Sequence, residues 1–181
     1  LNPYAGTFFE EQARGLMANG CKVSVFFVGY KPFSSDDKLE NKEYDDNGLY
    51  TLHNDIKAIV PRNIRINYWY LCRRAYKIFK KYAEKHGSPE LLHAHSVYWG
   101  GIIARYISKK SGIPYIITEH LTNFITGGIK NKIDLEYAQK VFNDSAANIA
   151  VSTSFKNELS KFVNISENKF FVIHNMVAPL F

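Results

Sequence analysis

The sequence predicts an α/β fold in which a doubly wound parallel sheet carries helices on both faces. The clearest sign is the segment Leu91–His120, which contains a strand, a helix and a second strand in succession. Short apolar runs then keep alternating with helix-period segments as far as Phe170–Ile173, the last expected strand. Such alternation is typical of βαβ units, in which consecutive strands run parallel.

The chain opens with a loop and a helix. Thr7 and Glu10 have the spacing of a capping box, and apolar side chains recur with helical period until Gly20, which suits a helix end. The segment ending at Gly6 resembles the phosphate-approach loop of a doubly wound fold, although it fits an ordinary turn equally well. The strand that should precede this loop is missing, so we expect residues upstream of Leu1 to complete the sheet.

A buried strand, a polar stretch and a short strand are expected next. Cys21–Val28 is apolar enough for a buried strand. The polar and acidic stretch that follows ends at Asn47-Gly48, a dipeptide typical of tight hairpin turns. Leu49–Leu52 then has the pattern of a short strand.

A strongly basic segment between Pro61 and His86 holds eight basic residues and one acid. On a helix, the apolar face would consist of Trp69, Cys72, Tyr76, Phe79 and Ala83, and the opposite cationic face of Arg74, Lys77, Lys81 and Lys85. The cations could face water alone or anionic lipid head groups. Because the aromatic side chains are expected on the packing face, base stacking is disfavoured and no nucleic-acid partner is expected.

The rest of the chain alternates regularly. The expected strands are Leu91–His95, Ile113–Thr118, Ala147–Val151 and Phe170–Ile173, and the expected helices are Tyr98–Ser111, Ile133–Phe142 and Ser154–Phe162. Ligands of such sheets bind outside the carboxyl ends of the strands. His93, His95 and His120 fall at these ends and are therefore candidate site residues, although His93 and His95 could equally be strand-end residues without a chemical role.

Composition and missing motifs narrow the classes of protein. At 181 residues, with 46% hydrophobic and 22% charged residues, the chain suits one globular domain. Its cysteines, Cys21 and Cys72, are too few for a disulfide framework, which fits a cytoplasmic location. No apolar run is long enough to span a bilayer. Without G-x-G-x-x-G, G-x-x-x-x-G-K-[ST] or G-x-S-x-G, a dinucleotide site, a nucleoside-triphosphate site and a hydrolase triad are all disfavoured.

Four segments follow an order and spacing found together in one family of enzymes. They are Asn2–Gln12, Leu91–Gly101 with its H-x-H strand end, Gly112–His120 with its G-I-P and T-x-H pattern, and Val151–Ser154 together with Val172–Asn175. In this order they resemble the N-terminal, Rossmann-like domain of retaining family 4 glycosyltransferases, which have the GT-B fold. The resemblance covers nearly the whole chain.

The resemblance implies a two-domain enzyme that moves a sugar from a nucleotide-sugar donor to a glycan or lipid-linked acceptor. Residues 1–181 would form its acceptor-side domain. The family's donor-binding domain usually carries a Glu-x7-Glu motif, which this chain lacks, so we expect the chain alone to be inactive. The nucleotide-sugar is a co-substrate, and no metal or other cofactor is implied.

The same resemblance assigns roles to individual residues. His120 would lie closest to the transfer chemistry, and the backbone at Gly6 would approach the donor phosphates. The acceptor side would be lined by Thr7, His95, Tyr98, Thr122 and Asn123. Independently of the resemblance, the charge of Arg74, Lys77, Lys81 and Lys85 would allow peripheral contact with the inner face of the membrane.

Two other kinds of protein remain possible from the sequence. A non-catalytic, flavodoxin-like binding module would have a similar fold, and so would a GT-B nucleotide-sugar epimerase. The H-x-H strand end and the Asn175 segment favour the transferase over the module. A Glu-x7-Glu motif in a second βα domain would decide the question for the transferase.

Overall fold

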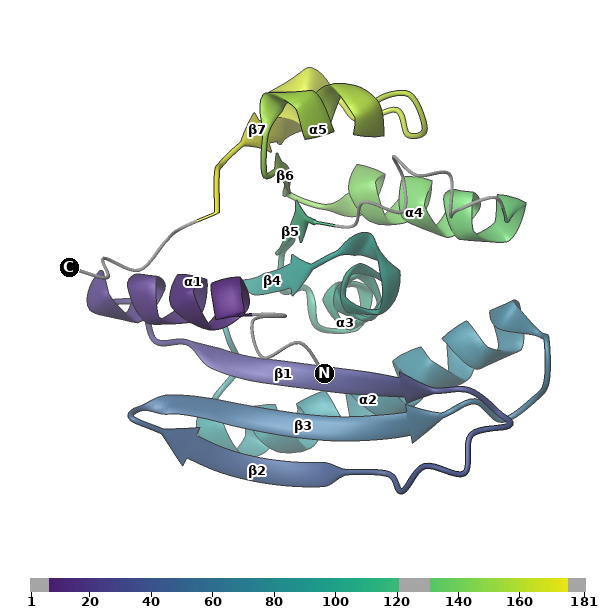
Figure 1. Ribbon diagram of the computed structural model, residues 1–181. Coiled ribbons are helices and arrows are strands. Elements are labelled where there is room, and N and C mark those ends of the chain that lie inside the picture. Colours follow the sequence, from purple (N-terminus) through teal and green to yellow (C-terminus); the bar gives the residue numbers. More distant parts are fainter. Residues whose placement is uncertain (1–6, 121–130, 176–181) are drawn as a thin grey trace.

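The computed structural model describes residues 7–120 and 131–175, which form two sheets (Figure 1). One sheet has the order β1-β3-β2 and the other the order β4-β5-β6-β7. The strands are β1 (Ser24–Lys31), β2 (Asn41–Asp46), β3 (Leu49–Lys57), β4 (Leu92–His95), β5 (Tyr115–Glu119), β6 (Ala147–Ala150) and β7 (Phe170–Val172). The helices are α1 (Thr7–Ala18), α2 (Ile64–His86), α3 (Ile102–Ser111), α4 (Lys132–Asp144) and α5 (Thr153–Leu159), with two short turns, η1 (Val97–Gly101) and η3 (Glu167–Lys169).

The four-stranded sheet is parallel throughout, as predicted from the alternation of strands and helices. Its strands correspond to four of the five that we expected to be parallel neighbours. In the register, Ala94 lies beside Ile117, and Thr118 lies beside Ile149. The carboxyl ends of β4 and β5 therefore meet at one edge of the sheet, where the sequence has its histidines.

The three-stranded sheet departs from the prediction. The expected strand Cys21–Val28 lies at Ser24–Lys31 and pairs in parallel with β3, not with the four-stranded sheet. β2 was not predicted, and it pairs antiparallel with β3 through the expected Asn47-Gly48 turn, in which both residues have positive φ. All side chains of β2 are exposed and most are charged or polar, so it has no hydrophobic pattern to detect. Such a charged strand protects a sheet edge from unwanted pairing.

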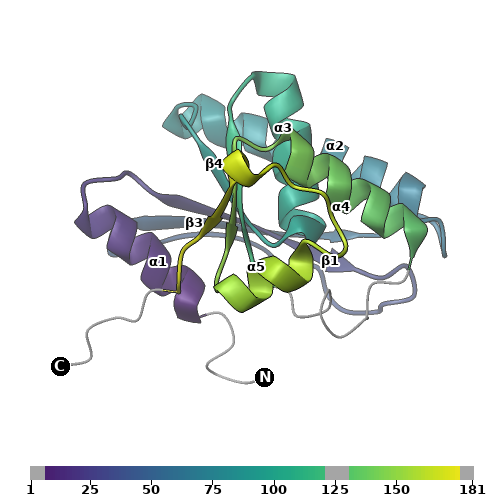
Figure 2. The same cartoon turned by 90° about the horizontal axis from the view of Figure 1, so that it is seen from above.

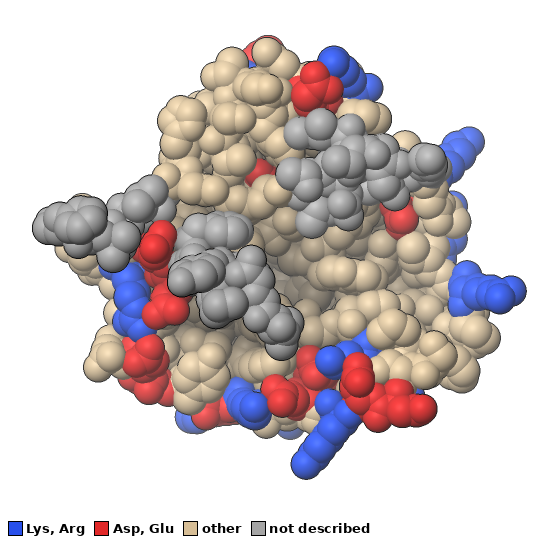
Figure 3. Space-filling view, viewed as in Figure 1, with Lys and Arg blue, Asp and Glu red and all other residues tan. Residues whose placement is uncertain are grey.

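Helices cover both faces of the sheets, as the doubly wound prediction requires. Figure 2 shows α1 and α5 on one side and α2, α3 and α4 on the other. One hydrophobic cluster joins α3, α4 and α5 to the four-stranded sheet, and a second joins α2 and α3 to β1 and β3. Acidic and basic side chains gather along the lower edge of the face seen in Figure 3, in the region that the three-stranded sheet occupies in Figure 1. The α/β fold class is therefore confirmed.

The basic helix α2 begins and ends as its sequence suggests. The Asn63 side chain accepts the Ile66 backbone N–H as an N-cap, and Gly87 follows the last turn with φ of 89°. Its buried residues are Asn67, Tyr68, Leu71, Cys72, Ala75 and Phe79. Trp69 was wrongly predicted to lie on the apolar face of this helix, because its side chain is 54% exposed. The Arg73 guanidinium carbon lies 5.0 Å from the centroid of the Trp69 ring. Burial raises the pKa of the Cys72 thiol to about 12, so this cysteine is a packing residue.

The helix expected at Tyr98–Ser111 begins only at Ile102. The tight turn η1 precedes it, and Ser96 and Trp99 there have φ of 66° and 59°. Such left-handed backbone cannot be part of a right-handed helix, which explains the shortened boundary. None of the helices in the described residues is both long and apolar enough to cross a bilayer.

Candidate functional site

Three histidines gather at the carboxyl edge of β4 and β5. His95 Nδ1 and His120 Nε2 lie 3.3 Å apart, and the two rings are stacked with centroids at 5.5 Å. The ring of His93 stacks on that of His95 with centroids at 4.6 Å, and its Nε2 lies 2.7 Å from Thr118 Oγ1. The structure therefore brings together the histidines that the sequence placed at neighbouring strand ends.

These imidazoles are held in their neutral form. Burial lowers the pKa of all three below the ordinary value of 6.5, to about 3 for His95 and to about 4 for His120. The neighbouring imidazoles lower the pKa of His95 and His120 further, because each disfavours a positive charge on the next. In a neutral pair one ring nitrogen donates and the other accepts, so His95 and His120 can fix each other's tautomer.

The first helix lies against the histidine pair. The ring of Phe9 in α1 meets His95 edge-on at 4.6 Å between centroids and His120 at 5.3 Å. Because Phe9 is in the first turn of α1, the start of this helix lies beside both imidazoles. Gly6 and the rest of the loop before α1 lie outside the described residues, so the role expected for Gly6 stays a prediction.

A fully buried carboxylate beneath the histidines organises this edge. Glu119 is 0% exposed, and its two oxygens accept the backbone N–H of Val97 at 2.6 Å and that of His120 at 3.0 Å. One side chain thus joins the end of β5 to the turn that follows β4. The sequence analysis did not single out Glu119, because an acid in an apolar strand is visible but its partners are not.

The turn after His95 is tightly closed. Ser96 donates its backbone N–H to the Thr118 carbonyl at 2.8 Å, and Gly101 donates to the Ser96 carbonyl at 2.9 Å. A Cβ on Gly100 would lie 2.8 Å from the His95 carbonyl oxygen, so only glycine fits this close approach. The two glycines before α3 therefore allow the turn to close.

Aromatic side chains continue from this turn toward β1. Trp99 stacks on Tyr30 with ring centroids at 4.1 Å and meets Tyr68 edge-on at 5.4 Å. Tyr98 is half-buried, and burial raises the pKa of its hydroxyl, with Asp134 and Glu119 adding to the effect, so the phenol stays protonated. Tyr98 follows His95 closely in the sequence and lies in the same turn as Trp99.

A groove of about 950 Å³ lies at the carboxyl ends of β1 and β3, and the sequence analysis missed it. Its walls come from three segments that are distant in the chain: residues 30–34, residues 58–67, and residues 131 and 133. Two arginines, Arg62 and Arg65, and two aromatic side chains, Tyr30 and Phe33, line it. The only local sign of this groove in the sequence was the pair of basic residues that flank Asn63, the N-cap of α2.

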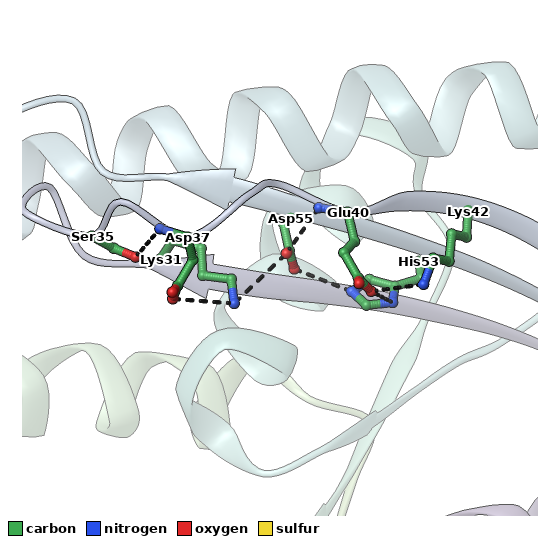
Figure 4. Close-up of polar contacts among 7 residues, drawn as sticks. All are labelled: Lys31, Ser35, Asp37, Glu40, Lys42, His53 and Asp55. Carbon is green, nitrogen blue, oxygen red and sulfur yellow. Dashed lines mark hydrogen bonds and ion pairs between the residues drawn. The ribbon is translucent and has the colours of Figure 1, made fainter.

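A second polar cluster, shown in Figure 4, lies on all three strands of the β1-β3-β2 sheet and on the segment between β1 and β2. The buried carboxylate of Asp55 accepts the Glu40 backbone N–H at 3.1 Å and lies 3.1 Å from His53 Nε2 and 3.8 Å from Lys31 Nζ. Burial acts to raise the pKa of Asp55, but the Glu40 and His53 contacts and the Lys31 charge lower it overall. The carboxylate fills the space above Gly29, where a Cβ would collide with it. These contacts tie the segment after β1 to β3, and we interpret the cluster as structural.

The other predicted site residues are not all described. Gly6, Thr122 and Asn123 lie outside the described residues, and of Thr7 only the backbone, at the start of α1, is described. On α2 all four predicted cationic residues are exposed, and Lys85 also forms an ion pair with Glu43 at 3.2 Å. Lys81 and Lys85 also line a hollow of about 220 Å³ against β2 and β3. In the described residues no group of three or more His, Cys, Asp or Glu side chains is placed to hold a metal ion, and the expectation of metal-independent chemistry stays a prediction.

Comparison with known proteins gives the family. The model of Glycosyltransferase Family 4 matches residues 5–179, which is nearly the entire chain. No curated protein sequence matches the chain significantly. The matched range contains the histidine edge, Glu119 and the groove, and the fold is the α/β arrangement expected for half of a GT-B enzyme. The chain therefore belongs to glycosyltransferase family 4, in the N-terminal, Rossmann-like domain of its GT-B fold.

Proposed function

We propose that this protein transfers a sugar from a nucleotide-sugar donor to a glycan or lipid-linked acceptor, with retention at the anomeric carbon. The single observation that carries the proposal is the histidine pair, His95 and His120, placed at the carboxyl edge of the sheet in a chain matched by a glycosyltransferase family. Open α/β sheets bind their ligands at this edge. The donor would be held mainly by a second domain, so residues 1–181 alone would bind it weakly and not catalyse transfer.

The physical demands of the reaction fit a neutral histidine pair. During transfer the diphosphate leaves with growing negative charge and the anomeric carbon becomes oxocarbenium-like. Backbone N–H groups at the start of α1, near Gly6, would stabilise the departing phosphates. A neutral His120 can donate an N–H to a sugar hydroxyl without placing a cation beside the oxocarbenium-like carbon, while His95 holds its ring in place.

The residues that follow β4 and β5 would form the acceptor side. His95 and Tyr98 lie on the β4 side, and Thr7, Thr122 and Asn123 would add polar contacts. The reaction as proposed needs neither a metal nor another cofactor, because positioned hydrogen-bond donors stabilise the charge.

The helix α2 provides a surface for peripheral attachment to the inner face of the membrane, in a cytoplasmic protein. Arg74 and Lys77 are exposed, and Trp69 and Ile66 on the same helix are 54% and 42% exposed. An exposed tryptophan beside cations suits the boundary between lipid head groups and water. Such attachment would bring the enzyme to a lipid-linked acceptor.

The proposal is tested by incubating the intact protein, expressed from its complete gene, with UDP- and GDP-sugars and a panel of glycan and lipid-linked acceptors. We expect release of the nucleoside diphosphate together with a glycosylated product whose anomeric configuration, read by NMR, matches that of the donor. Conversion of the nucleotide-sugar to its epimer, without transfer, would favour the epimerase. Failure to consume any nucleotide-sugar would contradict both enzymes and favour a binding module.

A further inference from the structure

The groove at the carboxyl ends of β1 and β3 has a positively charged wall. Arg62 lines the groove and forms no ion pair with any residue of the described ranges 7–120 and 131–175. The backbone at Arg62 has a positive φ of 56°. Arg65 also lines it, and its only described ion pair is with Glu136 at 3.3 Å, between side chains that are 59% and 40% exposed. An ion pair this exposed contributes little, so Arg65 can exchange Glu136 for an anionic ligand.

Two helices also begin at this groove. Asn63 and Asn131, the N-caps of α2 and α4, both line it. The first turn of the 23-residue helix α2 contains no acidic residue, so no carboxylate offsets the positive end of its dipole. The first turn of α4 contains Asp134, whose carboxylate accepts the Tyr68 hydroxyl at 2.9 Å. Two arginines and the start of α2 in one hollow favour a ligand group with several anionic oxygens, such as a phosphate.

The rest of the lining is largely apolar and is held in place. The buried side chain of Asn67 accepts the backbone N–H of Ile59 at 3.1 Å and donates to the Val60 carbonyl at 2.9 Å, which fixes the segment after β3. Tyr30 and Phe33 also line the groove, and Phe33 is 48% exposed. A ligand that suits this groove therefore combines an anionic group with a ring or an apolar body.

The groove is joined to the histidine edge through an aromatic contact. Tyr30, in its wall, stacks on Trp99 in the turn that follows His95. A ligand that reached from the arginines toward this turn would approach the side of the sheet where we place the transfer chemistry.

We propose that this groove binds the phosphate group of a phosphorylated acceptor, with its ring or apolar part on Tyr30 and Phe33. This inference rests on the proposed function, because it names the chemical class of the acceptor. Arg62 and Arg65 hold the phosphate oxygens, and the start of α2, whose first turn has no acidic residue, adds to the positive potential.

The test measures binding by isothermal titration calorimetry on the intact protein, without any sugar transfer. The probes are phenyl phosphate, a soluble aromatic phosphomonoester; dihexanoyl phosphatidic acid below its micelle concentration, a lipid phosphate; and benzoate, a ring with a single carboxylate. The site variant is Arg62→Gln/Arg65→Gln. The matched control is Lys22→Gln/Lys80→Gln, which removes the same charge from two exposed lysines that do not line the groove.

We expect at least one phosphate probe to bind the wild type and the control alike, and to bind Arg62→Gln/Arg65→Gln about tenfold or more weakly, as loss of charge-assisted contacts implies. Tighter binding of phenyl phosphate would indicate a water-soluble acceptor, and tighter binding of the lipid phosphate a lipid-linked one. Equal weakening in both variants, binding of benzoate as tight as that of phenyl phosphate, or no binding of either phosphate probe would overturn the proposal. The proposed function is tested separately, because sugar consumption can fail while the groove still binds phosphate.

Discussion

Acidification from pH 7.5 to pH 5.0 should destabilise the protein through the buried histidines. An imidazole whose pKa is lowered in the folded state stays neutral there, while in the unfolded chain it becomes protonated below about 6.5. The unfolded state then binds more protons, so the free energy of unfolding falls as pH falls. The loss begins below the unfolded-state pKa and continues until pH approaches the folded-state values of about 4 for His120 and about 3 for His95.

The size of the loss follows from the distance between pH 5.0 and the unfolded-state pKa. About 1.5 pH units at ~1.36 kcal/mol each gives about 2 kcal/mol for each histidine, and hence about 4 kcal/mol for His95 and His120 together. His93 acts in the same direction, because burial lowers its pKa too. Carboxylates contribute little in this window, since the ordinary pKa of a glutamate is only 4.5.

The assay is urea-induced unfolding at pH 7.5 and 5.0 at constant ionic strength. In the variant with His95→Gln and His120→Gln, the difference between the two pH values should shrink by most of the predicted ~4 kcal/mol, whatever its absolute stability. The reasoning would be refuted by a wild type whose free energy of unfolding changes by less than ~1 kcal/mol between the two pH values. It would also be refuted by a double variant that keeps the full dependence.

Three further predictions concern other parts of the molecule. Glu119→Ala should lower the free energy of unfolding by about 3 kcal/mol or more, because two buried backbone N–H groups lose their acceptor; a loss under ~1 kcal/mol in urea unfolding would contradict this. Gly29→Ala should cost about 1–3 kcal/mol in the same assay, because the new Cβ displaces the Asp55 carboxylate, and prior removal of that carboxylate by Asp55→Ala should relieve most of the cost. Arg74→Glu/Lys81→Glu should reduce co-sedimentation with anionic vesicles, and salt should reduce that of the wild type, whereas insensitivity to both would leave α2 as a solvent-facing helix.

The fold was predictable because its strands and helices have strong local patterns. The alternation from Leu91 to His120 was sufficient to predict parallel strands, and Asn47-Gly48 was sufficient to predict a turn before β3, although not the strand β2 on its other side. The exposed, charged strand β2 has no apolar face, so its pairing depends on the neighbouring strand β3 and not on its own sequence. Trp69 was misassigned because helical period alone cannot distinguish the edge of an apolar face from its centre.

The candidate site was predictable only in part. The positions of His95 and His120 follow from the rule that parallel strands end at one edge of the sheet, but their low pKa values depend on burial. The left-handed backbone at Ser96 and Trp99 is set by tertiary contacts, among them the Glu119 carboxylate, which comes from a different strand. The groove could not be predicted, because its walls join segments that are distant in the chain.

The most direct test of the central claim compares the turnover of two histidine variants of the intact enzyme. His120→Ala should reduce kcat by about 10²-fold or more, the scale expected for a positioned polar group at the reacting centre. His53→Ala, which removes a half-buried histidine from the polar cluster of Figure 4, should leave kcat within about twofold of the wild type if the fold is kept. A His120→Ala enzyme that transfers sugar at the wild-type rate, or an equal loss in His53→Ala, would contradict the placement of the chemistry at the histidine edge.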